Sequence, residues 1–316
     1  MKEGYIPKEQ RKNILLLTDD IRFTSGVGNV GKEIVLHTAH RYNWYNIGAA
    51  MRHPDQGKIF DLSEEINKHA GIDDAEVLIQ PNNGYGDPRL LRQLMEQRKI
   101  DAIFLITDPR YFEWLFQIEN EVRQKIPIIY LNIWDDLPAP MYNKTFYESV
   151  DTLLGISKQT VNINKMVLGN KAKNKIIDYV PHGMNTEVFH PIIVEDLEFT
   201  AFKKQAGVED KDFVLFFNSR NIRRKQIPDT MLAWKYFLDK LPKEKADKCV
   251  FVLHTELVSD HGTDLQAVAS VIFGENSPNI KFSTNKLSTQ HLNYLYNLAD
   301  AQILLTSNEG WGLSRT

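Results

Sequence analysis

The sequence predicts an α/β protein made of two Rossmann-like, doubly wound domains, the second of them incomplete. Three observations predict this class. The chain has 316 residues, more than one hydrophobic core usually fills. Short apolar runs alternate with amphipathic helical segments, which is typical of a parallel sheet. The alternation restarts after a charged stretch at 195–212, so we expect domains at 1–192 and 193–316, with a linker around 191–202.

The first domain is expected to open with a strand at 13–20, a glycine turn and a helix. Asp87 before Pro88 predicts the start of another helix. Further strands are expected at 42–51, 75–81, 100–108, 126–136 and 150–157, with helices at 109–125 and from 158, and a strand and loop at 174–191.

The second domain repeats the pattern on a smaller scale. Apolar runs at 212–221, 249–256, 280–285 and 300–307 alternate with helical patterns at 228–241 and 288–299. A doubly wound domain usually carries more strands, which is why we expect this one to be incomplete.

Composition and charge exclude several classes of protein. Hydrophobic residues make up 42% of the chain and charged residues 25%, as in ordinary globular proteins. The formal net charge of −3 gives no general attraction to polyanions. Cys249 is the only cysteine, so no intrachain disulfide can form. With no membrane-length apolar run and no secretion signal at the start, we expect a cytoplasmic protein.

The first candidate site is the glycine loop of the first domain. Gly26, Gly28 and Gly31 read G-x-G-x-x-G, which lets backbone approach a phosphate at the start of a helix. A tight strand-to-helix turn explains the same glycines equally well. A nicotinamide site would also need an acid on the next strand tip, and 46–51 offers none.

The second candidate site is a basic loop after the strand at 212–221. Arg220, Arg223, Arg224 and Lys225 put four cations within six residues at the edge where such sheets bind ligands. Arginine and lysine suit a diphosphate there, by forked hydrogen bonds and by point charge. A solvated basic loop is the alternative interpretation.

The third candidate site closes the chain. Glu309, Gly310, Trp311, Gly312 and Leu313 follow the last apolar run. Glycines around an aromatic residue expose backbone N–H groups, an arrangement that binds anions. A carboxylate in that position suits the hydroxyl groups of a sugar, which donate hydrogen bonds.

Together these sites resemble GT-B glycosyltransferases, most closely the retaining glycosyltransferase family 4. Arg220 and Lys225 match the arginine and lysine of the family's basic loop, and Glu309 to Leu313 read E-G-W-G-L against the family's E-G-F-G-L. The family's second glutamate would fall at position 317, so we expect a longer enzyme cut within this motif. The stretch at 180–191, with His182 and Gly183, is similar to the family's hinge.

The resemblance implies a substrate and roles for these residues. A nucleoside-diphosphate sugar would be the donor substrate, with no cofactor, held between two facing domains. Its sugar would pass to the hydroxyl of a glycan, a lipid, a small molecule or a modified nucleic-acid base. His182 and Gly183 would lie at the cleft, where His182 either lines it or ties down a loop. The donor would be bound by Gly26, Gly28, Arg220, Arg224, Lys225, Glu309, Gly310, Trp311, Gly312 and Leu313.

Candidates on the acceptor side are carboxylates at strand ends. Asp108, Asp135 and Asp136 could bind acceptor hydroxyls or serve as a base. Capping of the helix at Pro109 is the alternative for Asp108. The aromatic stretch 111–116 is interpreted first as a helix face packed in the core, and second as a platform for a sugar. No residue spacing suggests a metal site.

Two other classes of function stay open at this point. The same fold could serve a nucleotide-sugar epimerase or a sugar phosphorylase. The 316-residue form could also be a non-catalytic nucleotide-binding fragment, because it lacks half of the acids expected in the donor pocket.

Overall fold

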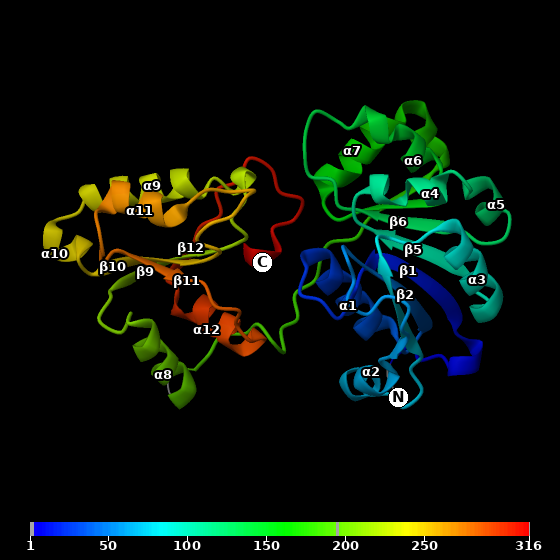
Figure 1. Cartoon of the computed structure of the whole chain (residues 1–316), viewed down its shortest axis with the longest axis horizontal. Coiled ribbons are helices and arrows are strands. Elements are labelled where there is room, and N and C mark those ends of the chain that lie inside the picture. Colours follow the sequence, from blue (N-terminus) through cyan, green and yellow to red (C-terminus); the bar gives the residue numbers. More distant parts are fainter. Residues whose placement is uncertain (1–2, 194–195, 316) are drawn as a thin grey trace. The chain divides into compact units, whose positions relative to one another are not determined.

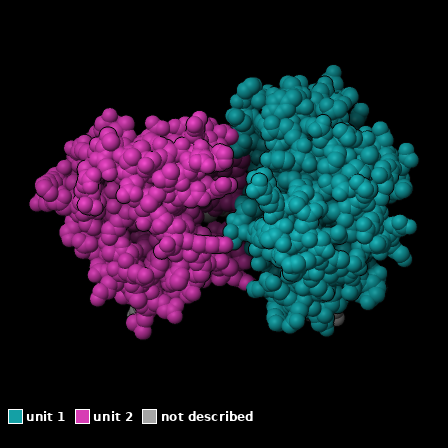
Figure 2. All heavy atoms as spheres, in the orientation of Figure 1, with its two compact units in different colours: residues 1–182 teal, residues 183–316 magenta. Residues whose placement is uncertain are grey.

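The computed structural model describes residues 3–193 and 196–315 and divides the chain into two compact units. Unit 1 runs from Met1 to His182 and unit 2 from Gly183 to Thr316, coloured separately in Figure 2. Residues 194 and 195, within the expected linker, lie outside the described residues. The rest of that linker leads into a helix of unit 2, α8 (Leu197–Ala206).

Unit 1 is a parallel α/β sheet of the predicted class. Its eight strands follow the order β3-β4-β2-β1-β5-β6-β7-β8, and all neighbours are parallel except β3 and β4. The strands are β1 (Lys12–Asp19), β2 (Tyr42–Ala50), β3 (Phe60–Asp61), β4 (Val77–Asn83), β5 (Ala102–Ile106), β6 (Ile128–Asn132), β7 (Thr152–Gly155) and β8 (Ile176–Tyr179).

Helices cover both faces of this sheet (Figure 1). Leu15 and Leu17 of β1 pack in one core with the helices that follow β4 and β5, whereas Gly31 of α1 lies against Leu16 and Thr18 on the other face. The α-helices are α1 (Gly26–Thr38), α2 (Ser63–Ala70), α3 (Pro88–Arg98), α4 (Glu113–Phe116), α5 (Glu119–Arg123), α6 (Lys144–Glu148) and α7 (Lys158–Leu168).

Side-chain caps begin the helices that the sequence predicted. Ser25 accepts a hydrogen bond from the N–H of Gly28 at the start of α1, and Asp87 accepts from Arg89 and Leu90 at the start of α3. Each cap satisfies N–H groups that have no partner inside the helix. The predicted strand, glycine turn and helix at the start of unit 1 are therefore confirmed, and Ser25 is the N-cap of the helix.

The single helix expected at 109–125 is wrong. The segment forms a 3₁₀ turn at Pro109–Phe112, then α4 and then α5. Between the two helices the N–H of Ile118 bonds to the carbonyl of Leu115, three residues back, which tightens the backbone. This tightening lets Phe112, Leu115 and Val122 all reach one core, where each is at most 2% exposed.

Unit 2 repeats the architecture with a smaller, fully parallel sheet. Its four strands follow the order β11-β10-β9-β12. They are β9 (Phe213–Asn218), β10 (Cys249–His254), β11 (Ile280–Ser283) and β12 (Ala301–Gln302). α9 (Ile227–Asp239) and α11 (Leu265–Phe273) cover one face, while α8 and α12 (Thr289–Leu298) cover the other, as Figure 1 shows; α10 (Lys243–Ala246) leads into β10.

The last strand is much shorter than the apolar run at 300–307 predicted. After Gln302 the N–H of Ile303 still bonds to Phe216, but the chain then leaves the sheet. The N–H of Ser307 and the hydroxyl of Thr306 both bond to the carbonyl of Arg224, in the loop after β9. Because Thr306 and Ser307 bond to the loop after β9, they do not continue the pairing of β12 with β9. No helix of the described ranges is long and apolar enough to cross a membrane.

We predict that Gly155→Ala destabilises unit 1. A Cβ on Gly155 would lie 2.7 Å from Cγ2 and 2.9 Å from the backbone nitrogen of Val161, so α7 would have to move off the sheet. Such overpacking costs about 1–3 kcal/mol. Gly26→Ala is the matched control, since a Cβ there meets nothing within 4 Å. Thermal unfolding followed by circular dichroism should separate the two variants; equal melting temperatures would contradict the prediction.

Candidate functional site

The strand order of unit 2 reverses beside β9. β10 and β11 extend the sheet to one side of β9, whereas β12 pairs on its other side. The loops after β9 and β12 therefore lie next to each other at the carboxyl edge of the sheet, the edge where all parallel strands end. Open α/β sheets bind ligands at such reversals. The basic loop and the E-G-W-G-L segment of the sequence are these two loops.

Lys225 is the most buried cation of the basic loop. It belongs to a 3₁₀ turn at Arg223–Lys225, directly before α9, and its side chain is only 7% exposed. Arg224 beside it is 35% exposed. The turn is fixed from the other loop, because Thr306 and Ser307 bond to the carbonyl of Arg224.

Glu309 joins the two loops through its carboxylate. Its Oε2 atom accepts from Nη1 of Arg224 at 3.1 Å and forms an ion pair with Nζ of Lys225. Nη1 of Arg224 also donates to the carbonyl of Asn308 at 2.8 Å. The structure thus brings Arg224, Lys225 and Glu309 together, although 84 residues separate the last two.

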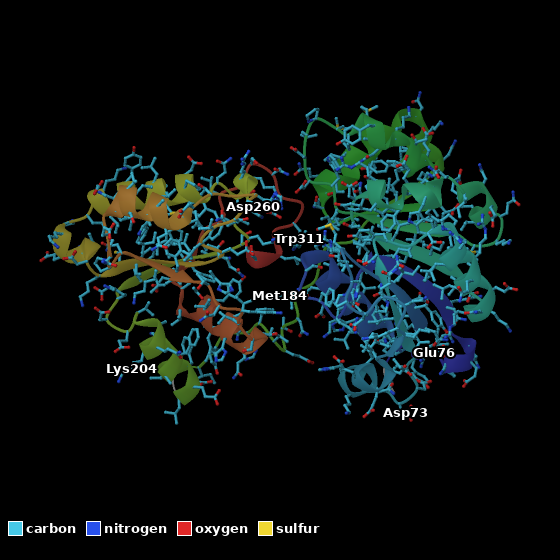
Figure 3. The ribbon with its side chains drawn as sticks, viewed as in Figure 1. Asp73, Glu76, Met184, Lys204, Asp260 and Trp311 are labelled. Carbon is cyan, nitrogen blue, oxygen red and sulfur yellow. The ribbon has the colours of Figure 1, made fainter. Side chains whose placement is uncertain are left out.

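The other two cations of the loop lie differently. Arg220 and Arg223 are exposed, and within the described ranges neither forms an ion pair. Between them the buried Asn221 donates to the carbonyls of Glu256 and Thr263, and the N–H of Arg223 bonds to the carbonyl of His261. These bonds tie the basic loop to the loop after β10, where Figure 3 labels Asp260. The hydrogen-bonded Asn221 braces the loop, while Arg220 and Arg223 remain exposed.

The end of the E-G-W-G-L segment turns back onto unit 2. Gly312 is buried with φ +84°, a left-handed conformation that favours glycine. Gly310 and Trp311 are half-buried, Leu313 is 42% exposed, and a 3₁₀ turn begins at Leu313. The hydroxyl of Tyr296, from α12, donates to the carbonyl of Ser314 and anchors this turn. Figure 3 labels Trp311 on the segment.

The sheet of unit 1 reverses its strand order between β1 and β5. β2 and β4 lie to one side of β1, and the chain then returns to place β5 on its other side. The loops after these two strands hold the glycine loop and Asp108. Asp19, which ends β1, accepts from the hydroxyls of Ser25 at 2.5 Å and of Tyr85 at 2.6 Å. Burial and the bond to Asp19 raise the pKa of Tyr85, so this phenol stays protonated and donates.

The three glycines of the G-x-G-x-x-G loop are glycine for different structural reasons. A Cβ on Gly28 would lie 3.0 Å from the carbonyl oxygen of Asp20, and one on Gly31 would lie 3.0 Å from Cγ2 of Thr18. Gly28 serves the tight turn before α1 and Gly31 the close packing of α1 on β1, as the turn interpretation expects. A Cβ on Gly26 meets nothing within 4 Å, and its backbone needs no glycine. Packing therefore accounts for Gly28 and Gly31 but not for Gly26.

A buried carboxylate that the sequence analysis did not single out holds this glycine loop. Asp20 is fully buried and accepts from the N–H and the guanidinium of Arg22 and from Nε2 of His53 at 3.0 Å. The N–H of Asp55 donates to Nδ1 of His53, so the ring is the tautomer that carries its proton on Nε2. Burial by itself would raise the pKa of Asp20, but the bonds from Arg22 and His53 outweigh it and lower that pKa.

Asp108 lies at the carboxyl edge of β5 and caps the turn that follows it. Its carboxylate accepts from the N–H of Arg110 at 3.0 Å and pairs with the guanidinium of the same residue. The capping interpretation is therefore confirmed. Thr107, just before it, is buried with φ +107°, which is rare for a β-branched residue. Strain of this kind is concentrated at functional sites.

Asp135 and Asp136 follow β6 on a loop braced from below. The buried amide of Asn132 donates to the hydroxyl of Tyr147 and to Asn164, while its oxygen accepts from the N–H of Trp134. Asp136 is exposed and bonds to the N–H of Leu137, and Nε1 of Trp134 donates to its carbonyl. Asp135 is half-buried, and within the described ranges its carboxylate accepts no hydrogen bond and forms no ion pair. Of the three carboxylates, Asp135 is thus the one without a hydrogen-bond or ion-pair partner in the described ranges.

The side chains of the aromatic stretch 111–116 are divided between the core and the surface. Phe112 and Leu115 are buried in the core, as the first interpretation holds. Tyr111 is 57% exposed and stacks on Tyr85, with ring centroids 4.9 Å apart. Tyr142, 60% exposed, packs edge-to-face on Trp134. Exposed aromatic rings therefore accompany the carboxylates at this edge of the sheet.

The remaining predicted residues lie at the boundary between the units. His182 ends unit 1 and is half-buried, and burial lowers its pKa to about 4, so its ring is neutral at pH 7. Gly183 begins unit 2, is exposed, and has space for a Cβ. In the described ranges no group of three His, Cys, Asp or Glu side chains is placed to hold a metal ion.

We predict that Asp20→Asn lowers the free energy of unfolding at pH 7 by about 3 kcal/mol, because the partly buried Arg22 loses its closer anion and keeps only Asp55, at 3.3 Å. Since the pKa of Asp20 is lowered in the folded state, this contribution is present above about pH 4 and is lost as the pH falls through the folded-state pKa. Urea unfolding should show a difference in the free energy of unfolding between Asp20→Asn and wild type that is large at pH 7 and smaller below pH 4. Glu64→Gln, an exposed control on α2, should unfold with the same free energy as wild type. A difference for Asp20→Asn that does not depend on pH would contradict this role of the Asp20 charge.

No family model matches the sequence, and no curated protein matches it. Solved structures do match the fold. A glycosyltransferase from Rickettsia africae is 14% identical with a TM-score of 0.62, and the match covers 94% of this chain and 73% of that one. An E. coli trehalose-6-phosphate protein bound with UDP-2-fluoro glucose is 12% identical with a TM-score of 0.66, covering 95% and 79%.

A third similar structure is an α,α-trehalose-phosphate synthase (UDP-forming) from Burkholderia xenovorans, in complex with glucose-6-phosphate. It is 12% identical with a TM-score of 0.63, and the match covers 96% of this chain and 81% of that one. At these identities the likeness establishes the fold alone. Both units of the chain are Rossmann-like, and the fold is the one shared by GT-B glycosyltransferases.

Proposed function

We propose that the protein is a glycosyltransferase that moves a hexose from a nucleoside-diphosphate sugar to an acceptor hydroxyl. The observation that carries this proposal is the meeting of Arg224, Lys225 and Glu309 at the strand-order reversal of unit 2. Two cations suit the charge of a diphosphate, and a carboxylate among them suits the hydroxyls of the attached sugar. The resemblance to family 4 supports transfer with retention, and the fold supports the class of enzyme.

In this proposal unit 2 stabilises the leaving group. When the bond between sugar and diphosphate breaks, negative charge develops on the diphosphate, and Arg220, Arg224 and Lys225 would neutralise it. The backbone N–H groups of Gly310 to Leu313 would add to this effect. Fixed charges of this kind accelerate a reaction because they need no rearrangement when the charge appears. The bonds from Asn221 and Thr306 that brace the basic loop support this function.

The acceptor would use the carboxyl edge of unit 1. Asp135 would take the proton of the acceptor hydroxyl or bind that hydroxyl, and the exposed rings of Tyr111 and Tyr142 would contact the acceptor. Gly26, at the open start of α1, would allow close approach of the donor phosphate or sugar. The similar structures bind UDP-2-fluoro glucose and glucose-6-phosphate, so UDP-glucose and sugar phosphates are the first substrates to test.

The direct test is turnover of UDP-glucose, GDP-mannose and ADP-glucose by the 316-residue chain, with glycans, sugar phosphates and lipids as acceptors. Release of nucleoside diphosphate only when an acceptor is present would support the proposal. Epimerised donor without an acceptor, or a requirement for free phosphate, would support an epimerase or a phosphorylase instead. Binding of donor without any turnover would identify a nucleotide-binding fragment.

We predict that Arg220→Ala, Arg224→Ala and Lys225→Ala each weaken the binding of nucleoside diphosphate. Each variant loses a charged hydrogen bond, worth about 1.5–3 kcal/mol. Lys240→Ala, an exposed cation beyond the far end of α9, is the control and should bind like wild type. Isothermal titration with UDP measures the effect, and circular dichroism checks that each variant is folded. Unchanged affinity in all three variants would identify the loop as solvated surface.

We predict that Asp135→Asn lowers acceptor-dependent turnover by at least about 100-fold if Asp135 is the base. The affinity for the donor should stay unchanged, because Asp135 contacts the acceptor and not the donor in this proposal. Asp73→Asn is the matched control, since Asp73 is exposed before β4, at the opposite edge of the sheet (Figure 3). Full turnover by Asp135→Asn would exclude Asp135 as the base.

A further inference from the structure

The ion pair of Glu309 occupies the cations that a diphosphate would need. Lys225 is almost completely buried, and the Glu309 carboxylate is itself only 23% exposed. One oxygen, Oε2, contacts both Nζ of Lys225 and Nη1 of Arg224. A phosphate oxygen that contacts both cations would take the place of this oxygen. A diphosphate and Glu309 therefore compete for the same two positive charges.

The competition has a cost that depends on the ligand. A displaced Glu309 carboxylate has to find new hydrogen-bond donors, because its side chain is only 23% exposed and a partly buried carboxylate without partners is unfavourable. The hydroxyl groups of a sugar attached to the diphosphate can provide such donors. A bare diphosphate provides none, and its terminal phosphate brings further negative charge next to the carboxylate.

We propose that Glu309 determines specificity by opposing bare diphosphates and favouring diphosphates that carry a sugar. This inference rests on the function proposed above and assigns Glu309 a second role within it. Selectivity is a difference of two affinities, and a repulsive group directed at the wrong ligand is an efficient way to obtain it. After transfer, the same carboxylate opposes the nucleoside diphosphate that remains and promotes its release.

The decisive variant is Glu309→Gln, which keeps the shape of the side chain and removes its charge. Inorganic pyrophosphate is the first probe, since it carries the diphosphate charge and no hydroxyl group. Glu309→Gln should bind pyrophosphate roughly five- to tenfold more tightly than wild type, because the competing charge is gone. UDP should show the same gain, whereas the nucleotide sugar that the enzyme turns over should bind more weakly to the variant. Isothermal titration measures all three.

Two controls keep the result interpretable. Glu244→Gln removes the same charge from an exposed position on α10 and should leave the affinity for pyrophosphate unchanged, which excludes a general effect of net charge. Wild-type protein provides a measurement without any substitution: it should bind its nucleotide sugar more tightly than the corresponding nucleoside diphosphate. Thermal unfolding shows whether Glu309→Gln retains the fold.

The outcomes separate this inference from the proposed function. Tighter binding of pyrophosphate by Glu309→Gln, with weaker binding of the nucleotide sugar, supports the inference. Binding of pyrophosphate by wild type that is equal or weaker in the variant overturns the inference and leaves the proposed function standing. Failure of both proteins to bind pyrophosphate, UDP and every nucleotide sugar tested overturns the proposed function and the inference together.

Discussion

Parallel pairing is the constraint from which the rest of the molecule follows. Parallel strands end at the same edge of a sheet, so every connection must cross back over a face, and every loop that follows a strand lies at the carboxyl edge. The strand order reverses beside β1 in unit 1 and beside β9 in unit 2, and open α/β sheets bind ligands at such reversals. Residues far apart in the sequence meet at the reversal of unit 2, as Lys225 and Glu309 do.

Each of the two edges holds a buried charge together with its counter-charge. In unit 1 the buried group is the carboxylate of Asp20, paired with Arg22 and His53; in unit 2 it is the ammonium of Lys225, paired with Glu309. A buried pair is costly to break, so each pair fixes the loop that carries it. The two differ in accessibility. Asp20 is fully buried and positions the glycine loop, whereas the Glu309 side chain is 23% exposed, which suits the exchange of partners that we propose.

Hydrogen bonds beneath the loops hold the candidate residues in place. Asn132 braces the loop of Asp135, and Asn221 joins the loops after β9 and β10. Such support matters because a charged group accelerates a reaction only when it is already positioned where charge develops. Thr107 supports the same conclusion. Its strained, left-handed backbone lies at the end of β5, next to the strand-order reversal of unit 1.

The sequence by itself determined the fold class, the elements and the loops of interest. Alternating apolar runs and the caps at Ser25 and Asp87 act within a few residues, so local patterns were enough to place α1, α3 and most strands. The basic loop and the E-G-W-G-L segment were recognisable because charge and glycine content are local properties as well. The broken helix after Asp108 and the short β12 were missed, because core packing in one case and attachment to the loop of Arg224 in the other act between distant segments.

Only the tertiary structure decided which of the candidate residues meet. Arg224 and Lys225 pair with Glu309, whereas Arg220 is exposed. Asp108 pairs with Arg110, and the carboxylate of Asp135 has no partner in the described ranges. The tertiary structure also revealed Asp20 and His53, whose partnership has no signature in the sequence because 33 residues separate them. The physical reason is that electrostatic and hydrogen-bond partnerships depend on distance in space, and the order of strands in the sheet sets that distance.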